Sequence, residues 1–302
     1  MAYLQLLVGA HSQVLVDAPA SRMLPAIRRI VPSDVIQSLV RGLEDFTAMP
    51  SHAVFLCVIY PLVAIFLIAL TLHHAMLPLA FPLAAGFALI GPLAATGLYE
   101  MSRRREAGLE VSWIHAVDVL RSPSRGAILA LGFLLMAIFF VWLAVAEAIY
   151  VADFGYGSPT SIRHFLMDVL TTSAGWNLIA VGTGVGFLFA VVALVTSAVS
   201  FPLLLDRDVG AAVALLTSIR VVAANPATMA LWGFIVAAML VIGSAPFFLG
   251  LTVVMPVLGH ATWHLYRKAV EPNCNPRRDR PPRKSGRRYA ADFPSVLLPT
   301  RW

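Results

Sequence analysis

Residues 227–259 read ATMALWGFIVAAMLVIGSAPFFLGLTVVMPVLG and contain no charged residue, which makes this stretch decisive for the fold. A membrane crossing needs about 20 apolar residues, so the stretch is too long for one helix across a bilayer. Residues 243–246, GSAP, combine backbone freedom with a proline that lacks an amide donor. We therefore predict a tight turn there, between membrane helices at 227–242 and 247–266.

Other parts of the chain have the same character. The composition is 59% hydrophobic and 13% charged, which is more apolar surface than a soluble domain of 302 residues buries. The predicted fold class is therefore all-α, a polytopic membrane protein with six transmembrane helices. We place these helices at residues 53–72, 77–99, 127–149, 177–204, 227–242 and 247–266.

The positions of the basic residues predict how the chain is oriented. Six crossings put both termini on one side, and of the 22 Lys and Arg residues all except Arg163 fall on that side. Basic loops of membrane proteins face the cytoplasm. With five spans, the basic tail would lie outside, against this rule. We expect a multi-pass protein of the bacterial inner membrane with a cytoplasmic N-terminus and a cytoplasmic C-terminus.

Three amphipathic segments, each ending at a proline, precede the three predicted helical hairpins. The first, DVIQSLVRGLEDFTAMPSH at 34–52, repeats apolar residues at helical spacing up to Pro50, and the others occupy 111–125 and 208–226. We interpret the chain as three hairpins, each preceded by a cytoplasmic amphipathic interfacial helix and related by an axis near the membrane normal. The alternative is that amphipathic connectors occur in any polytopic protein, without a true repeat.

The same pattern divides the chain into three parts. Residues 1–50 form a cytoplasmic N-terminal segment with an interfacial helix, 51–270 form the six-helix transmembrane domain, and 271–302 form a basic, proline-rich cytoplasmic tail. The formal charge of +6 favours anionic lipid head groups as a partner and not nucleic acid. The tail residues predicted to contact lipid, or alternatively to be solvated, are Arg277, Arg278, Arg280, Arg283, Lys284, Arg287 and Arg288.

Two sets of polar residues are candidate sites. His260 and His264 lie four residues apart on one helical face and could bind a metal or a haem, or could simply anchor the helix at the interface. No other cofactor is predicted. A threefold bundle could gather polar residues at the cytoplasmic helix ends into one ligand or partner site, although each could instead reach water separately. This set is Glu100, Arg103, Asp206, His260 and His264.

No catalytic residue is predicted. The sequence shows no Ser, His and Asp arrangement, no Walker loop, no HExxH pair and no CxxC pair, so we do not expect an enzyme. The leading hypothesis is a nonenzymatic accessory or assembly subunit that packs against other membrane-protein subunits. The alternatives are a carrier for a small or lipidic solute, suggested by the repeat and by helix prolines, and a metal- or haem-binding membrane protein.

Several segments carry a resemblance to a known family, notably AAGFALIGPLAATGLYEMSRRREAGLE at 84–110 and PVLGHATWHLYRKAVEP at 256–272. The chain resembles, over roughly residues 25–272, an uncharacterised proteobacterial family of integral inner-membrane proteins with a domain of unknown function. The resemblance implies the membrane location and no activity. Some relatives carry a cytochrome oxidase label, but a haem-copper core needs several histidines deep in its spans. An accessory role beside such a respiratory complex stays open.

Overall fold

The computed structural model describes four stretches of the chain and the isolated positions 58, 62, 65, 66 and 69; the stretches are residues 24–49, 74–157, 159–245 and 248–272. Within these residues the chain is helical, and the single β contact is an isolated bridge between Ile27 and Val270. The predicted all-α class is therefore confirmed.

Four helical stretches of the described chain are long and apolar enough to cross a membrane. They are Leu77–Glu106, Arg125–Phe154, Ser173–Asp206 and Pro226–Ser244. These match the second to fifth predicted spans, and each is equal to or longer than the predicted one. The first predicted span, 53–72, lies outside the described stretches, so the total of six spans stays a prediction.

Two of the four long stretches consist of more than one helix. The first joins the end of η2 (His74–Leu79) to α5 (Ala80–Ala94) and α6 (Thr96–Glu106), with Ala95 between the last two. The third joins α10 (Ser173–Ser197) to α11 (Ser200–Asp206). Pro92 in α5 and Pro202 in α11 lack the amide hydrogen that a continuous helix would use. The other two stretches are single helices, α8 (Arg125–Phe154) and α13 (Pro226–Ser244).

The sixth predicted span forms the helix α14 (Leu251–Ala269), which is not among the four apolar stretches. The reason is its C-terminal half, where His260, His264, Arg267 and Lys268 lower the hydropathy. The turn was predicted at residues 243–246, but α13 continues to Ser244. The ends of α13 and α14 approach closely, because a Cβ atom on Gly250 would lie 2.7 Å from the Gly243 carbonyl oxygen.

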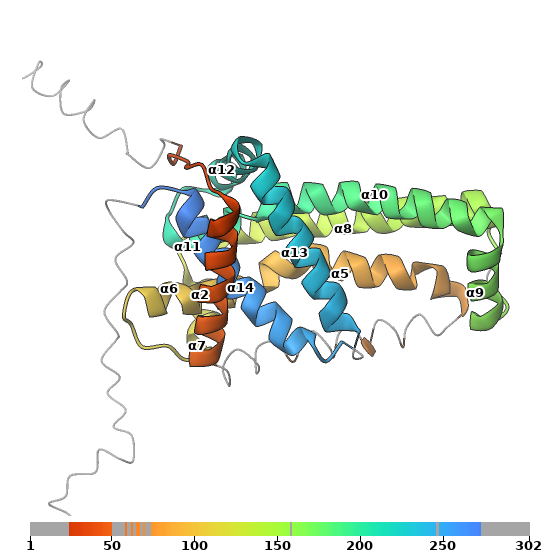
Figure 1. Ribbon diagram of the computed structural model, residues 1–302, viewed down its shortest axis with the longest axis horizontal. Coiled ribbons are helices and arrows are strands. Elements are labelled where there is room, and N and C mark those ends of the chain that lie inside the picture. Colours follow the sequence, from red (N-terminus) through yellow and green to blue (C-terminus); the bar gives the residue numbers. More distant parts are fainter. Residues whose placement is uncertain are drawn as a thin grey trace, which may run out of the picture.

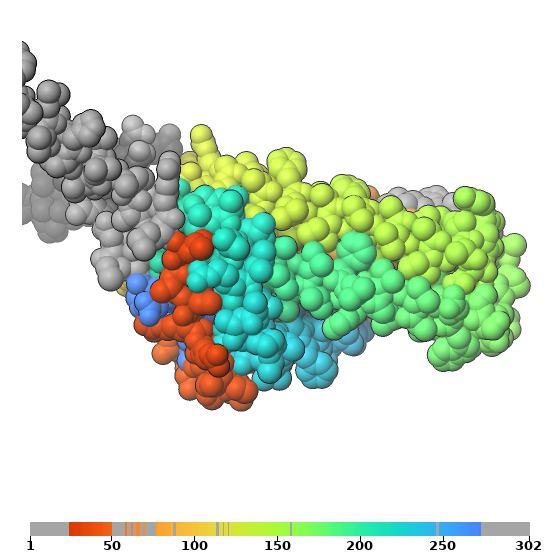
Figure 2. All heavy atoms as spheres, turned by 90° about the horizontal axis from the view of Figure 1, so that it is seen from above, coloured from red at the N-terminus to blue at the C-terminus, as the bar shows by residue number. Residues whose placement is uncertain are grey.

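Figure 1 shows an elongated molecule in which α5, α8 and α10 run along the long axis. The helix α9 (Ile162–Thr171) closes one end, where the Ser161 hydroxyl accepts a hydrogen bond from the His164 amide. Seen from above, α8 and α10 extend away from the opposite end along the long axis (Figure 2). This opposite end, which we call the head region, contains α6, α11, the second half of α14 and four further helices. These are α2 (Pro32–Ala48), α7 (Trp113–Ala116), η3 (Val117–Arg121) and α12 (Ala211–Ala224).

One pattern of contact recurs three times around the head region. The helices α6, α11 and α14, which end the successive predicted hairpins, contact one another. Each amphipathic segment packs on the helix that ends a different hairpin: α2 on α14, α7 and η3 on α6, and α12 on α11. The shared core is tightly packed, with Leu98, Phe201, Leu204 and Trp263 each at most 2% exposed. A repeat of three units would produce this cyclic order, although the repeat itself remains an interpretation.

Candidate functional site

A contact between small residues brings α2 against α14. A Cβ atom on Gly42 would lie 2.7 Å from the Ala261 backbone nitrogen and 2.7 Å from the Val257 carbonyl oxygen. Asp45 follows three residues later on the same side of α2, because an α-helix repeats about every 3.6 residues. The close approach therefore carries the Asp45 side chain into the head region, where the residue is 4% exposed.

The Asp45 carboxylate is bound by side chains from two neighbouring helices. From α6, the Ser102 hydroxyl donates a hydrogen bond to Oδ2 at 2.6 Å, and Arg105 forms an ion pair with Oδ1. From α14, His264 Nε2 lies 2.9 Å from Oδ2. His260 Nδ1 lies 2.7 Å from the Ser102 oxygen. We call these five residues the Asp45 cluster.

The surroundings of Asp45 keep its carboxyl group ionised. Burial by itself would raise the pKa of Asp45, because the charged form loses its hydration. The hydrogen bonds from His264 and Ser102, and the charge that His264 and His260 can carry, outweigh burial, so the pKa lies below its ordinary value. Asp45 is therefore an acceptor of hydrogen bonds in the cluster near neutral pH.

The hydrogen bonds also determine where His260 carries its proton. The Ser102 hydroxyl has one hydrogen, and it is donated to ionised Asp45. His260 Nδ1 must then carry a hydrogen and donate it to the Ser102 oxygen. In the neutral ring, Nε2 is left as a bare acceptor, and this atom is buried without a hydrogen-bond partner in the described part of the chain.

The Asp45 cluster contains Ser, His and Asp but not in the order of a nucleophilic site. In a catalytic triad, histidine lies between the acid and the serine and takes the serine proton. Here Ser102 lies between Asp45 and His260 and gives its proton to the acid. Ser102 is also only 1% exposed, so a substrate could not reach it without a rearrangement of the helices. The geometry indicates a buried structural cluster.

A second group of side chains, the Asp206 network, connects α6, α11 and α14. The Tyr266 hydroxyl donates to Asp206 at 2.6 Å, and Arg267 Nη1 lies 3.6 Å from the same carboxylate. Arg267 also donates to Glu106 at 3.0 Å, and the Trp263 indole donates to the other Glu106 oxygen at 2.8 Å. The three central helices of the head region are therefore held together by charged and aromatic groups on α14.

Glu100 and Arg103 pair within α6. The Arg103 guanidinium donates two hydrogen bonds of 2.8 Å to the two Glu100 oxygens, and both side chains are at least nine-tenths buried. The predicted polar set is thus distributed over three groups. His260 and His264 belong to the Asp45 cluster, Asp206 belongs to the Asp206 network, and Glu100 and Arg103 bind each other. All five lie in the head region, as expected for helix ends on one side.

The sequence pattern did not point to Asp45, Ser102 or Arg105. Their partners are far away in the chain, since 57 positions separate Asp45 from Ser102 and 158 separate Ser102 from His260. One signal was available: on α2, Ser38, Gly42 and Asp45 form a small or polar line beside the apolar face. Such a line indicates close packing against another helix.

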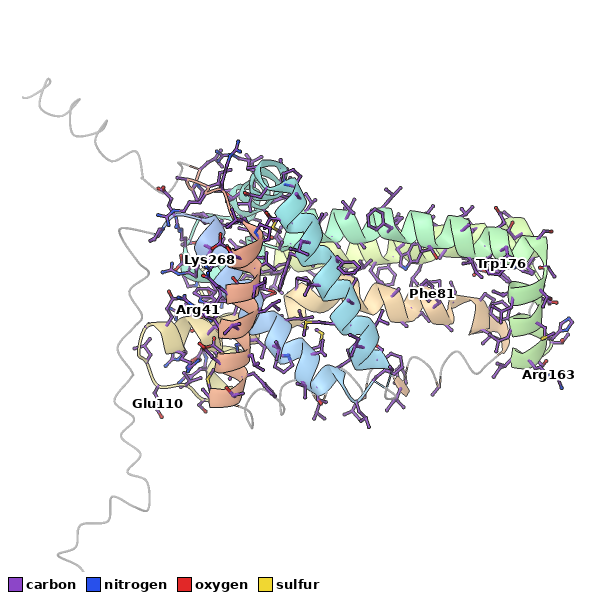
Figure 3. All side chains as sticks on the ribbon, viewed as in Figure 1. Arg41, Phe81, Glu110, Arg163, Trp176 and Lys268 are labelled. Carbon is purple, nitrogen blue, oxygen red and sulfur yellow. The ribbon has the colours of Figure 1, made fainter. Side chains whose placement is uncertain are left out.

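Positive charge lies mainly at the head region. Figure 3 shows Arg41 and Lys268 there and Arg163 at the opposite end, on α9. Lys268 Nζ binds Asp34 at 2.8 Å and Gln37 at 2.6 Å, which ties α14 to α2 on its water-accessible side. The seven basic residues predicted to contact lipid lie in the tail after residue 272, outside the described stretches.

The predicted metal or haem site at His260 and His264 is not tested by the protein atoms alone. In the described stretches, no group of three or more His, Cys, Asp and Glu residues is arranged to hold a metal ion. His264 Nε2 is already bound to Asp45, and His260 Nε2 is the nitrogen without a partner. A metal or haem ligand at this pair therefore stays a prediction.

The fold and these polar groups define a class of protein: an all-helical integral membrane protein with a polar head region. Residues 80–206, from α5 to the end of α11, match the family described as "Predicted integral membrane protein (DUF2189)". The match confirms the resemblance to an uncharacterised membrane-protein family. No curated protein and no solved structure matches the chain. The matched segment contains Ser102, whereas Asp45, His260 and His264 lie outside it.

Proposed function

We propose that this protein is a nonenzymatic accessory or assembly subunit of a larger complex in the bacterial inner membrane, with a respiratory complex as one candidate. In this proposal the chain crosses the membrane six times, with its head region and both termini in the cytoplasm. The excess of basic residues at the head region supports the orientation, because basic segments stay on the cytoplasmic side.

The apolar surface of α8 and α10 is the observation that carries the proposal. Residues 127–146 and 176–205 contain no charged residue. The two helices pack on each other and still expose Phe133 and Phe140 on α8 and Phe187 on α10. In a membrane, such side chains contact lipid or other membrane helices.

Helix α10 also offers a place where a partner helix could approach closely. On α10, a Cβ atom on Gly182 or Gly184 would meet nothing within 4 Å, whereas one on Gly186 would lie 3.0 Å from Trp142 of α8. Small residues allow membrane helices to pack backbone to backbone. The open side of α10 at Gly182 and Gly184 therefore supports contact with another subunit.

The polar groups of the head region support a nonenzymatic role. Asp45, Ser102 and Asp206 use their polar atoms on neighbouring helices, and they are buried or nearly so. Buried hydrogen-bond networks of this kind stabilise one arrangement of helices. Structural hydrogen bonding therefore explains the acidic and histidine side chains of the head region, and no catalytic role is needed for them.

Photocross-linking in native membranes tests the proposal. A photoreactive amino acid replaces Leu188, which is exposed on α10, and the matched control replaces Phe234, which is exposed on α13. We expect an adduct with a protein of defined mass from position 188, with the same protein recovered when the chain is purified in mild detergent. Lipid adducts alone from both positions, together with a chain that purifies without partners, would contradict the proposal.

A second candidate function is ligand binding at His260. The supporting observation is its buried Nε2 atom, which has no hydrogen-bond partner among the residues that the structure describes. A neutral imidazole nitrogen is a good ligand for a transition metal or haem iron. Metal analysis and an absorption spectrum of the purified protein test this candidate. A colourless sample without metal, in which His260→Ala changes no spectrum, would exclude it.

A further inference from the structure

The helix α2 has three sides of different character. Its buried side packs on α14 and consists of Val35, Ser38, Gly42 and Asp45. The contact at Gly42 and the hydrogen bonds of Asp45 determine the rotation of α2 about its own axis. The other side chains therefore point in defined directions: Leu39 and Phe46 still pack against the core, whereas the residues on the outward surface point away from the bundle.

The outward surface of α2 divides into an apolar and a polar side. Successive residues of an α-helix are rotated by about 100°, so positions 36, 40 and 43 fall on one line. There Ile36, Val40 and Leu43 are 59%, 52% and 50% exposed. Arg41 and Glu44 are exposed on the other side of the helix. A helix with packed, apolar and polar sides is suited to a boundary between protein, lipid and water.

The helix α12 repeats this arrangement. It buries Ala214, Thr217, Ser218 and Val221 against the bundle and exposes Leu216 and Ile219. When the two segments are aligned on the prolines that follow them, Pro50 and Pro226, most exposed and buried positions coincide, although buried Thr217 is paired with exposed Arg41. The alignment pairs Val40 with Leu216, Leu43 with Ile219, Ser38 with Ala214 and Gly42 with Ser218.

The direction of α2 also fits a membrane surface. Figure 1 shows α2 running across the long axis along which α8 and α10 lie, and Figure 2 shows it crossing that axis from the other direction of view. If α8 and α10 cross the bilayer, α2 lies roughly in the plane of its surface. Arg28 and Arg29 lie a few residues before the helix, which begins at Pro32, and Arg41 is exposed on it.

We propose that Ile36, Val40 and Leu43 are embedded in the acyl chains of an anionic phospholipid leaflet, while Arg28, Arg29 and Arg41 contact its head groups. The Asp45 cluster positions this surface by holding α2 at one rotation on α14. The equivalent row on α12, Leu216 and Ile219, contacts the same leaflet. This inference rests on the membrane location of the chain and is independent of an accessory role.

Spin labels in nanodiscs test the inference. The full chain carries Cys57→Ser and Cys274→Ser, with one nitroxide at position 40 or, as a matched control, at position 44. Each disc of phosphatidylcholine and phosphatidylglycerol holds one copy. Oxygen concentrates in acyl chains and a nickel chelate stays in water. We expect the ratio of oxygen to nickel collisions to be several-fold higher at position 40 than at position 44. Equal ratios would overturn the inference.

Two further experiments identify what covers the exposed apolar residues Ile36, Val40 and Leu43. If a second copy covers them, discs with two copies will show dipolar broadening between labels at position 40 and protection from both reagents, which would also overturn the inference. In discs of phosphatidylcholine alone we expect the collision ratio at position 40 to fall. An unchanged ratio would refute the role of the anionic head groups.

A variant that releases α2 checks that the labels report its rotation. Gly42→Leu places a large side chain against Ala261, so we expect the difference between positions 40 and 44 to disappear. If this variant does not fold, the pair of labels in the parent chain still decides the question. The discs hold the chain alone, after any partner has been separated from it, so failure here and failure of the cross-linking experiment are distinguishable.

Discussion

The Ser102 hydroxyl of α6 donates a hydrogen bond of 2.6 Å to the Asp45 carboxylate of α2, across 57 positions of sequence. This bond lies where α2, α6 and α14 meet, and His264 and Arg105 bind the same carboxylate. A helix at the edge of the bundle is thereby joined to its centre. The stability of the head region and the orientation of α2 should both depend on Asp45.

Replacing Asp45 with asparagine should destabilise the protein. The change keeps the volume of the side chain but removes the charge that holds Arg105 and His264. We expect a loss of roughly 1–3 kcal/mol in the free energy of unfolding, the usual cost of leaving buried polar groups poorly matched. Thermal unfolding in detergent micelles measures the loss. Glu44→Gln, at an exposed neighbouring position, is the control and should change little.

The stability of the protein should decrease in acid, and Asp45 should account for part of the decrease. A carboxyl group with a lowered pKa in the folded state stabilises the fold above its unfolded pKa, and this contribution is lost as the pH falls through the folded pKa. We therefore expect the unfolding free energy to fall below about pH 5. Hydrogen bonds from Lys268 and the Val31 amide also lower the pKa of Asp34. Asp45→Asn should therefore reduce the pH dependence of the unfolding free energy without abolishing it. If the unfolding free energy of the parent chain and of Asp45→Asn fell equally steeply with pH, Asp45 would not be responsible for the decrease.

Adding one methyl group at Gly42 should disrupt the packing of α2 on α14. A Cβ atom there would lie 2.8 Å from the Ala261 Cβ and 2.7 Å from backbone atoms of α14. We expect Gly42→Ala to cost about 1–3 kcal/mol of unfolding free energy, as for other overpacked contacts. Ala261→Gly should restore part of the loss, because it removes one of the clashing atoms.

The matched control for this prediction is Gly126→Ala in the first turn of α8. Nothing lies within 4 Å of a Cβ atom at that position. Alanine is the better helix former, so the control should be neutral or slightly stabilising. A similar loss at both positions would show that the effect comes from helix propensity or expression and not from the contact with α14.

Removing the Tyr266 hydroxyl should weaken the contact between α14 and α11. Tyr266→Phe leaves the ring in the core but removes a donor to the Asp206 carboxylate. Hydrogen bonds to charged groups contribute roughly 1.5–3 kcal/mol, and we expect a loss in this range. Tyr156→Phe is the control, because Tyr156 is 95% exposed. Thermal unfolding of the two variants side by side gives the difference. An unchanged unfolding free energy in Tyr266→Phe would argue against this hydrogen bond.

Much of the fold was predictable because membrane helices leave a strong local signal. Uncharged stretches of sufficient length predicted the four apolar helical stretches that the structure describes. A break between α13 and α14 was predictable because residues 243–246, GSAP, interrupt an uncharged run, although α13 continues to Ser244. The less apolar character of α14 was harder to recognise, since His260 and His264 could equally lie at a membrane interface.

The candidate site was only partly predictable. The sequence pointed to His260 and His264 as a pair on one helical face, and the structure places both beside Asp45. It also suggested one shared polar site, but the hydrogen bonds assign Glu100 and Arg103 to each other and Asp206 to Tyr266. Choosing among these partners depends on the rotation of each helix, and a difference of one residue turns a side chain by about 100°.

The amino-acid sequence by itself determined that this protein is helical, rich in apolar segments that suit a membrane, and basic at one end, because hydropathy and charge act locally and can be read from each segment alone. Only the tertiary structure decided that Asp45, Ser102 and His260 meet, and which side of α2 faces outward. Those outcomes depend on close contacts such as that between Gly42 and Ala261, which form between helices far apart in the chain. The line of Ser38, Gly42 and Asp45 on α2 indicates close packing but does not identify the helix that it meets.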